Sequence, residues 1–229
     1  CTEEARKRLI QLGEEANRIY IIGSPDIDIM MSDQLPTLEE AKERYNIPFD
    51  VYGILMYHPV TTEYETIGEH IQAVVDAVIA SNRKDIVVYP NNDLGSEVIL
   101  NEYKRFEGNP NFRVFPSLRF EHFLTILKNA DFIIGNSSAG IRESGIYGIP
   151  AIDIGTRQSG RYSNAKETNL QHVEENRQDI LNVIQGIHDY RSTSHAFGNG
   201  NSTEQFFEII SKEEFWNTKI QKRFVDQDF

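Results

Sequence analysis

Short apolar segments and amphipathic segments alternate along most of this 229-residue chain. The apolar segments resemble β-strands, and they lie at residues 18–25, 50–59, 85–91, 111–117, 131–136, 150–155 and 170–173. The amphipathic segments have helical spacing, and they lie at residues 37–46, 65–82, 96–107, 120–130, 139–148 and 177–190. Such alternation is typical of βαβ units and a parallel sheet. The strands are apolar on both faces, as strands covered by helices on both sides should be.

This pattern predicts an α/β fold: a Rossmann-like, three-layer αβα domain with a parallel sheet over residues 1–200. Thr37 followed by Glu40 predicts a capping box at the start of one helix. A polar, glycine-rich segment at 194–203 leads into a helical tail, which we place at residues 201–229.

Composition limits the classes of partner. The net charge of −12 argues against binding to nucleic acid or to an anionic membrane, because both favour a basic surface. It does not exclude an anionic small molecule, because one pocket can be locally positive. No apolar run approaches the roughly 18 residues needed to cross a bilayer, and the charged first residues do not resemble a signal peptide. Cys1 is the single cysteine, so no internal disulfide can form and a reducing cytoplasm is expected.

Polar and glycine-rich loops follow the expected carboxyl ends of six strands. These loops lie at residues 23–28, 57–63, 89–96, 115–121, 135–143 and 155–161. Ligands of such folds bind at this edge of the sheet, near the point where the strand order reverses. Ordinary loop composition explains part of the enrichment. So many similarly equipped loops on one edge nevertheless indicate a binding site.

Ser137 and Ser138 follow one of these strands and precede a helix. The start of a helix presents free N–H groups and a positive dipole end, which together favour phosphate. The alternative is that one serine is only an N-cap. Gly140 would let a ligand approach the backbone closely. We therefore interpret this segment as a seat for phosphate.

Charged residues follow the serines. Glu143 lies a little over one helical turn beyond Ser138, where a carboxylate can accept hydrogen bonds from vicinal hydroxyls such as those of ribose. The alternative is a solvated helix residue. Arg157 ends the next strand and suits a phosphate or a carboxylate. Arg142 and Arg161 are weaker candidates for the same role.

His58 is the candidate acid or base. It follows a strand end, where a histidine can donate to an anion or transfer a proton near neutral pH. The remaining histidines have no convincing motif and are interpreted as structural or surface residues: His70, His122, His172, His188 and His195. No pair of them has metal-ligand spacing, so no metal site is predicted. The chain contains neither a Gly-x-Ser-x-Gly elbow nor a Walker loop.

Four motifs together resemble the UDP-N-acetylglucosamine 2-epimerases, in their hydrolysing branch, which feeds the synthesis of sialic-acid-type and legionaminic-acid-type sugars. The motifs are HPVTTE (58–63), YPNNDLGS (89–96), GNSSAGIRESGIYGIPAIDIGTRQSGR (135–161) and FGNGNST (197–203). They cover nearly the whole chain in the right order. The non-hydrolysing branch typically has Ser-Gly-Gly in place of the serine motif and lacks GTRQ, and this difference favours the hydrolysing branch.

The resemblance implies a two-domain architecture of the glycosyltransferase-B type, of which this chain would be mainly the C-terminal, UDP-binding half. The helical tail would then pack on an N-terminal domain that this sequence lacks. Position by position, the resemblance places UDP contacts at His58, Asn91, Leu118, Ser137, Ser138, Glu143 and Arg157. His58 would also assist the departure of UDP. No cofactor is expected, and the family usually forms dimers or tetramers.

The implied reaction has two steps: elimination of UDP to a 2-acetamidoglucal, then addition of water with inversion at C2. In this family, the carboxylates that act as the base at C2 belong to the N-terminal domain. This chain alone is therefore expected to bind UDP weakly and to turn over nothing. Three alternatives stay open: a glycosyltransferase of the same architecture, a non-catalytic nucleotide-sugar-binding domain, and a response-regulator-like or flavodoxin-like domain. The substrate is also open between UDP-N-acetylglucosamine and a UDP-2,4-diacetamido sugar.

Overall fold

The computed structural model describes residues 1–162 and 168–221. Its contacts divide the chain into two compact units. The larger unit is Leu35–Ser194, and the smaller one joins Cys1–Gln34 to the segment that begins at His195. This division differs from the sequence-based boundary at residue 200, because the first 34 residues group with the C-terminal segment and contribute no strand to the sheet.

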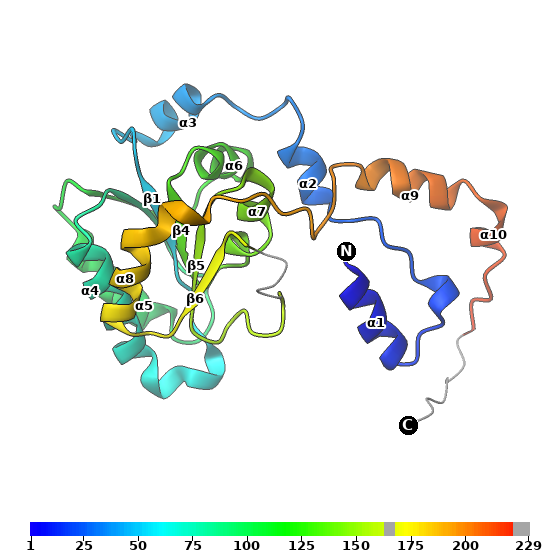
Figure 1. Ribbon diagram of the computed structural model, residues 1–229, viewed down its shortest axis with the longest axis horizontal. Helices are drawn as coiled ribbons and strands as arrows, with labels where there is room; N and C mark the ends of the chain where they lie inside the picture. The colour runs from blue at the N-terminus through cyan, green and yellow to red at the C-terminus, as the bar shows by residue number, and fades with distance from the viewer. Residues whose placement is uncertain (163–167, 222–229) are drawn as a thin grey trace. The chain divides into compact units, whose positions relative to one another are not determined.

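The larger unit is built on a six-stranded parallel sheet of order β3-β2-β1-β4-β5-β6 (Figure 1). The strands are β1 (Gly53–Met56), β2 (Asp85–Val88), β3 (Phe112–Phe115), β4 (Phe132–Gly135), β5 (Ala151–Ile154) and β6 (Leu170–Val173). Ile54 of β1 is in register with Ile86 of β2 on one side and with Ile133 of β4 on the other. The strand order reverses between β1 and β4, which makes their carboxyl ends the switch point of a doubly wound fold. The predicted Rossmann-like fold is confirmed.

Helices cover both faces of the sheet (Figure 1). The α-helices of this unit are α3 (Leu38–Tyr45), α4 (Ile67–Ala80), α5 (Ser96–Tyr103), α6 (Phe120–Lys128), α7 (Glu143–Tyr147) and α8 (Arg177–Gly186). Short 3-10 helices are η2 (Thr61–Thr66), η3 (Lys104–Phe106), η4 (Ser138–Gly140) and η5 (Ile187–Tyr190). Helix α4 packs against α5 and α8 on one face, and α6 packs against α3 and α7 on the other. The capping box of Thr37 and Glu40 at the start of α3 is confirmed.

The core lies between the sheet and the α4 side. Ile71, Val74 and Val78 of α4 are buried against Leu55 and Val87 of the sheet. The spacing of the buried α4 residues by three and four positions explains why this segment is a helix with one apolar face. Each such side chain stabilises the fold by roughly 1.5–3 kcal/mol relative to exposure. This rigid layer fixes the strand ends on which the candidate site depends.

The expected strand at 18–25 is wrong. The structure has a 3-10 helix η1 (Ala16–Arg18), an extended segment, and then α2 (Pro25–Met30). Pro25 lies in the first turn of α2, where its missing N–H costs nothing and its fixed φ suits a helix. The Ser24 N–H donates to the Phe197 carbonyl at 2.8 Å, so no ladder with the sheet is needed to satisfy it.

The smaller unit contains α1 (Glu3–Gln11), η1, α2, α9 (Ser202–Ile210) and α10 (Glu213–Trp216). The expected tail is therefore two helices within the described residues, and its last part, 222–229, lies outside them. Phe206, Phe207 and Trp216 are exposed. None of the helices that the structure describes is both long and apolar enough to cross a membrane.

Candidate functional site

The strand ends bring the sequence-predicted residues to one edge of the sheet. His58 follows β1, Asn91 follows β2, Leu118 follows β3, Ser137 follows β4 and Arg157 follows β5. Because all six strands are parallel, these residues lie beyond the carboxyl edge on which such folds bind ligands. The β1 and β4 ends, at the switch point, contribute the densest set of contacts described below.

Asn136 joins the loops after β1 and β5. Its Oδ1 accepts from the His58 backbone N–H at 2.7 Å, and its Nδ2 donates to the His58 carbonyl at 2.8 Å. Its own carbonyl accepts from Arg157 Nη1 at 3.1 Å and from Gln158 Nε2 at 2.8 Å. Gly135 precedes it with φ 131°, and a side chain there would meet the Met56 carbonyl of β1. Asn136 is fully buried, so it holds His58 and Arg157 in a fixed relation.

His58 has a defined tautomer. The Asn91 backbone N–H donates to His58 Nδ1 at 3.1 Å, so the neutral ring carries its proton on Nε2. Burial, and then the charge of Arg157, lower the pKa of His58 to about 4, against the opposing effects of Asp93 and Asn91. The sequence pattern suggested titration near neutral pH. In the free chain at pH 7 His58 is instead a neutral Nε2–H donor, because its site is desolvated and already holds a cation.

Arg157 supplies that cation. Burial, and then Arg161, lower the pKa of Arg157, while Asp93 raises it. A guanidinium starts from so high a pKa that it stays charged near neutral pH. A half-buried cation beside a neutral N–H donor and backbone amides is an arrangement that attracts an anion, even on a chain of net charge −12.

Ser137 and Ser138 lie at a 3-10 turn and not at the start of a continuous α-helix. Ser137 is the N-cap of η4, and its Oγ accepts from the Ala139 N–H at 3.3 Å. The expected helix at 139–148 is divided into η4 and the five-residue α7. So short a pair of helices has little macrodipole, and any affinity for phosphate here depends on hydroxyl and amide donors.

The other three predicted residues are Asn91, Leu118 and Glu143. Asn91 is exposed, and its Nδ2 donates to Asp93 Oδ2 at 2.5 Å. Leu118 is half-buried between β3 and α6, and the next N–H, of Arg119, donates to the Tyr45 hydroxyl at 2.9 Å. Glu143 is half-buried and is the first residue of α7. No direct hydrogen bond joins Leu118 or Glu143 to His58 among the contacts described.

Sequence reasoning missed Asn136 and Gln158, although both stand inside the motifs GNSSAG and GTRQ. Both are fully buried polar side chains, and such groups need hydrogen-bond partners. For Asn136 the local signal was an amide directly after an apolar strand that ends in a glycine, and Gln158 has no comparable signal.

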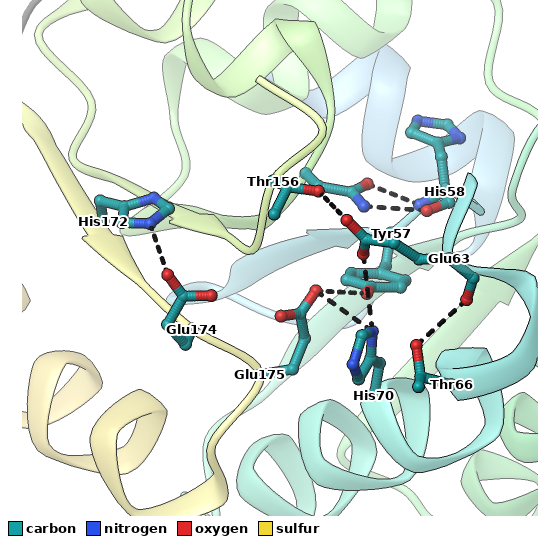
Figure 2. Close-up of polar contacts among 10 residues, drawn as sticks. Tyr57, His58, Glu63, Thr66, His70, Thr156, His172, Glu174 and Glu175 are labelled. Carbon is teal, nitrogen blue, oxygen red and sulfur yellow. Dashed lines mark hydrogen bonds and ion pairs between the residues drawn. The ribbon is translucent and has the colours of Figure 1, made fainter. Parts of the chain in front are cut away.

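A second group of polar side chains lies next to Tyr57, the residue after β1 (Figure 2). Glu63, His70 and Glu175 offer ligand atoms within 4.8 Å of one another. The group has the composition of a metal site, and it was not expected because Glu175 is far in sequence from Glu63 and His70. One oxygen of each carboxylate, however, already accepts a hydrogen bond from a protein hydroxyl, as described below.

The parallel sheet and its strand order define a Rossmann-like α/β domain. A family model described as UDP-N-acetylglucosamine 2-epimerase matches residues 1–211. A UDP-N-acetylglucosamine 2-epimerase of Neisseria meningitidis is 44% identical over 231 residues, covering 99% of this chain and 60% of the relative. The chain therefore belongs to the UDP-N-acetylglucosamine 2-epimerase family, and the family resemblance of the motifs is confirmed.

A more distant relative is named for a different substrate. A UDP-N,N'-diacetylbacillosamine 2-epimerase (hydrolyzing) of Legionella pneumophila is 28% identical, covering 92% of this chain and 56% of the relative. Among solved structures, the Methanocaldococcus jannaschii UDP-GlcNAc 2-epimerase in complex with UDP-GlcNAc and UDP has the same fold, with a TM-score of 0.71 at 19% identity, covering 92% of this chain and 59% of that one. The chain thus spans about three fifths of the length of each of these three proteins.

Proposed function

We propose that this chain is the UDP-sugar-binding part of a hydrolysing UDP-N-acetylglucosamine 2-epimerase. The observation that carries the proposal is the buried Asn136, which holds a neutral His58 and a cationic Arg157 together at the switch point of the sheet. Family membership supports a UDP-sugar as the ligand. The hydrolysing branch is supported by the NSSAG and GTRQ sequences and by relatives whose names carry that activity.

The proposed UDP contacts divide by chemistry. Arg157, His58 and the two serines would bind the diphosphate through charge and N–H or O–H donors. Glu143 would accept from the ribose hydroxyls, and the loop at Leu118 would contact uracil through its backbone. Asn91 would contact the nucleotide. Its backbone N–H also donates to His58 Nδ1 and so fixes the tautomer of His58.

The proposed reaction begins with elimination of UDP from the sugar. The C1–O bond breaks, a proton leaves C2, and a 2-acetamidoglucal remains. Charge then grows on the departing diphosphate, where Arg157 and the Nε2–H of His58 would stabilise it. A nearby anion favours the protonated form of a histidine, so bound UDP would raise the pKa of His58 from about 4 towards neutrality.

Water then adds to the glucal with inversion at C2, giving N-acetylmannosamine and UDP. A base at C2 is needed for the elimination, and we place it in a part of the longer protein outside this sequence. The chain alone would then bind UDP without turnover. The proposed enzyme is an oligomer of the cytoplasm and acts in the synthesis of sialic-acid-type sugars. Its helical tail would pack on the other domain.

The experiment is proton NMR of this chain with UDP and with UDP-N-acetylglucosamine, followed for hours. We expect broadened uridine resonances and no new sugar signals. The variant Arg157→Gln should bind UDP about tenfold more weakly, because it loses a charge-assisted contact. Arg105→Gln is the matched control, since Arg105 is an exposed arginine of η3, which precedes the amino end of β3, and it pairs with Asp76 and Glu102.

Two outcomes would contradict the proposal. Release of UDP and N-acetylmannosamine by the chain alone would show that it carries its own base. Equal UDP affinity in the Arg157 and Arg105 variants would remove Arg157 from the site. If UDP-N-acetylglucosamine does not bind while the diacetamido sugar nucleotide does, the substrate is the one named for the Legionella relative.

A further inference from the structure

Figure 2 shows a network of five side chains, those of Tyr57, Glu63, His70, Thr156 and Glu175. The Tyr57 hydroxyl donates to Glu175 Oε1 at 3.0 Å. His70 Nδ1 lies 3.7 Å from the same oxygen and 3.9 Å from Glu63 Oε2. The Thr156 hydroxyl donates to Glu63 Oε1. The network thus joins the ends of β1, β5 and β6 to α4 and η2.

Glu175 is the buried centre of this network. Its side chain is 7% exposed, and Tyr57 is 1% exposed. Burial first, and then Glu175, raise the pKa of Tyr57 far above its ordinary value, so the phenol stays protonated and donates. A buried carboxylate with well-placed donors holds a fixed position. Gly155, with φ +69°, leaves room for the Glu175 carboxylate, because a side chain at position 155 would collide with it.

No described hydrogen bond or ion pair joins the network to the side chain of His58 or Arg157, but the network contains the residue before each of them. Tyr57 precedes His58, and in Figure 2 their rings point to opposite sides of the chain. Thr156 precedes Arg157. Strands β1 and β5 are not neighbours, since β4 lies between them. Asn136 joins their loops on the ligand side, and the network joins them on the α4 side.

We propose that Glu175, together with His70, is a positioning group that sets the separation of His58 and Arg157 around a bound diphosphate. This inference rests on the proposed UDP site and adds to it residues that no strand-end motif contains. Fixed geometry of this kind matters because small displacements of charge-assisted donors weaken binding steeply.

A metal ion held by Glu63, His70 and Glu175 is the competing interpretation. The Glu175 oxygen that faces His70 is the same atom that accepts from Tyr57, and the other Glu63 oxygen accepts from Thr156. One oxygen of each carboxylate therefore already accepts a hydrogen bond from a protein hydroxyl. The arrangement fits a hydrogen-bonded brace better than a set of open ligands.

The test compares Glu175→Gln with Glu174→Gln in the 229-residue chain. The two residues are adjacent, but the Glu174 side chain is 72% exposed, and among the described ion pairs it faces His172 alone, at 3.5 Å. We expect the Glu175 variant to bind UDP about tenfold more weakly, with uridine affinity unchanged within twofold. Glu174→Gln should match the wild type for both ligands. Gly155→Ala, which displaces the carboxylate, should reproduce the Glu175 effect.

Side-chain NMR of the free chain separates failure of this inference from failure of the UDP proposal. The His58 ring and Arg157 Nε–H signals should shift in Glu175→Gln and stay in place in Glu174→Gln. If the wild type binds no UDP, the UDP proposal fails, and these shifts still decide whether the brace exists. Equal effects of the two variants on these signals and on UDP would overturn the inference. So would a rise in wild-type melting temperature with stoichiometric Zn²⁺ that Glu175→Gln abolishes.

Discussion

Asp85 is a fully buried carboxylic acid at the first position of β2, opposite Gly53 of β1. Neither of its side-chain oxygens has a hydrogen-bond partner among the described residues. Burial raises its pKa to about 7, although Arg83 opposes the shift, while Asp131 adds to it. A neutral acid at this position is therefore the form that the fold tolerates.

The pH dependence of stability follows from that shift. In the unfolded chain Asp85 ionises near pH 3.8, so the folded state holds the proton more tightly. Its contribution is fully present below the unfolded pKa and is lost as the pH rises towards 7, by an amount on the order of 4 kcal/mol. We predict that Asp85→Asn loses less free energy of unfolding than the wild type between pH 5 and pH 8, measured by urea denaturation.

Asp50→Asn is the matched control, because the Asp50 side chain is 97% exposed and pairs with Lys42 at the surface. It should follow the wild-type pH profile. Equal pH profiles for Asp85→Asn and wild type would mean that the Asp85 carboxyl is solvated in the folded protein.

At the scale of single elements, a side chain of α2 caps the first turn of α9. Asp28 accepts from the backbone N–H groups of Ser202 and Thr203 at 2.9 and 2.8 Å, and also from both hydroxyls. Partial burial alone would raise the pKa of Asp28, but these hydrogen bonds outweigh it and lower the pKa. The cap is therefore present at neutral pH and is lost only when the pH falls below the ordinary aspartate range.

We predict that Asp28→Ala loosens α9. Loss of an N-cap costs about 1 kcal/mol, so amide hydrogen exchange over residues 202–210 should speed up about fivefold. Asp33→Ala changes an exposed aspartate of the same unit and should leave α9 exchange unchanged. Uniform acceleration throughout the chain would show that Asp28 supports more than this helix.

Local pattern was enough to predict most elements. The segment 170–173 is the strand β6 as predicted, because its ends are apolar and turn residues bound it. The segment 18–25 has an equally apolar pattern and yet forms no strand. A strand exists only with a partner, and nothing local in RIYIIG reveals that the sheet ends at β6 and β3.

The site was predictable where it depends on strand ends and not where it depends on distant pairs. His58 and Arg157 follow strands, so the parallel fold alone brings them to one edge. The bonds of Asn136 to His58 join residues 78 apart, and the bond from Tyr57 to Glu175 joins residues 118 apart. Such pairs depend on strand order and register, which periodicity does not encode.

At the scale of the whole molecule, the two units divide the proposed tasks. All seven proposed UDP contacts, the complete sheet and the buried helix α4 belong to Leu35–Ser194. The smaller unit contributes helices with exposed Phe206, Phe207 and Trp216 and none of the proposed contacts. A unit that has its own core and satisfies its own sheet hydrogen bonds can fold alone.

We therefore predict that a chain of residues 35–194 folds and binds UDP within about threefold of the 229-residue chain. Thermal unfolding by circular dichroism and UDP titration by NMR would measure both properties. Arg157→Gln in the shorter chain should weaken UDP by the same factor as in the longer one, because the residues it contacts are all retained. A shorter chain that folds but does not bind UDP would place an essential nucleotide contact in residues 1–34 or beyond 194, and the assignment of the site to the strand ends alone would be wrong.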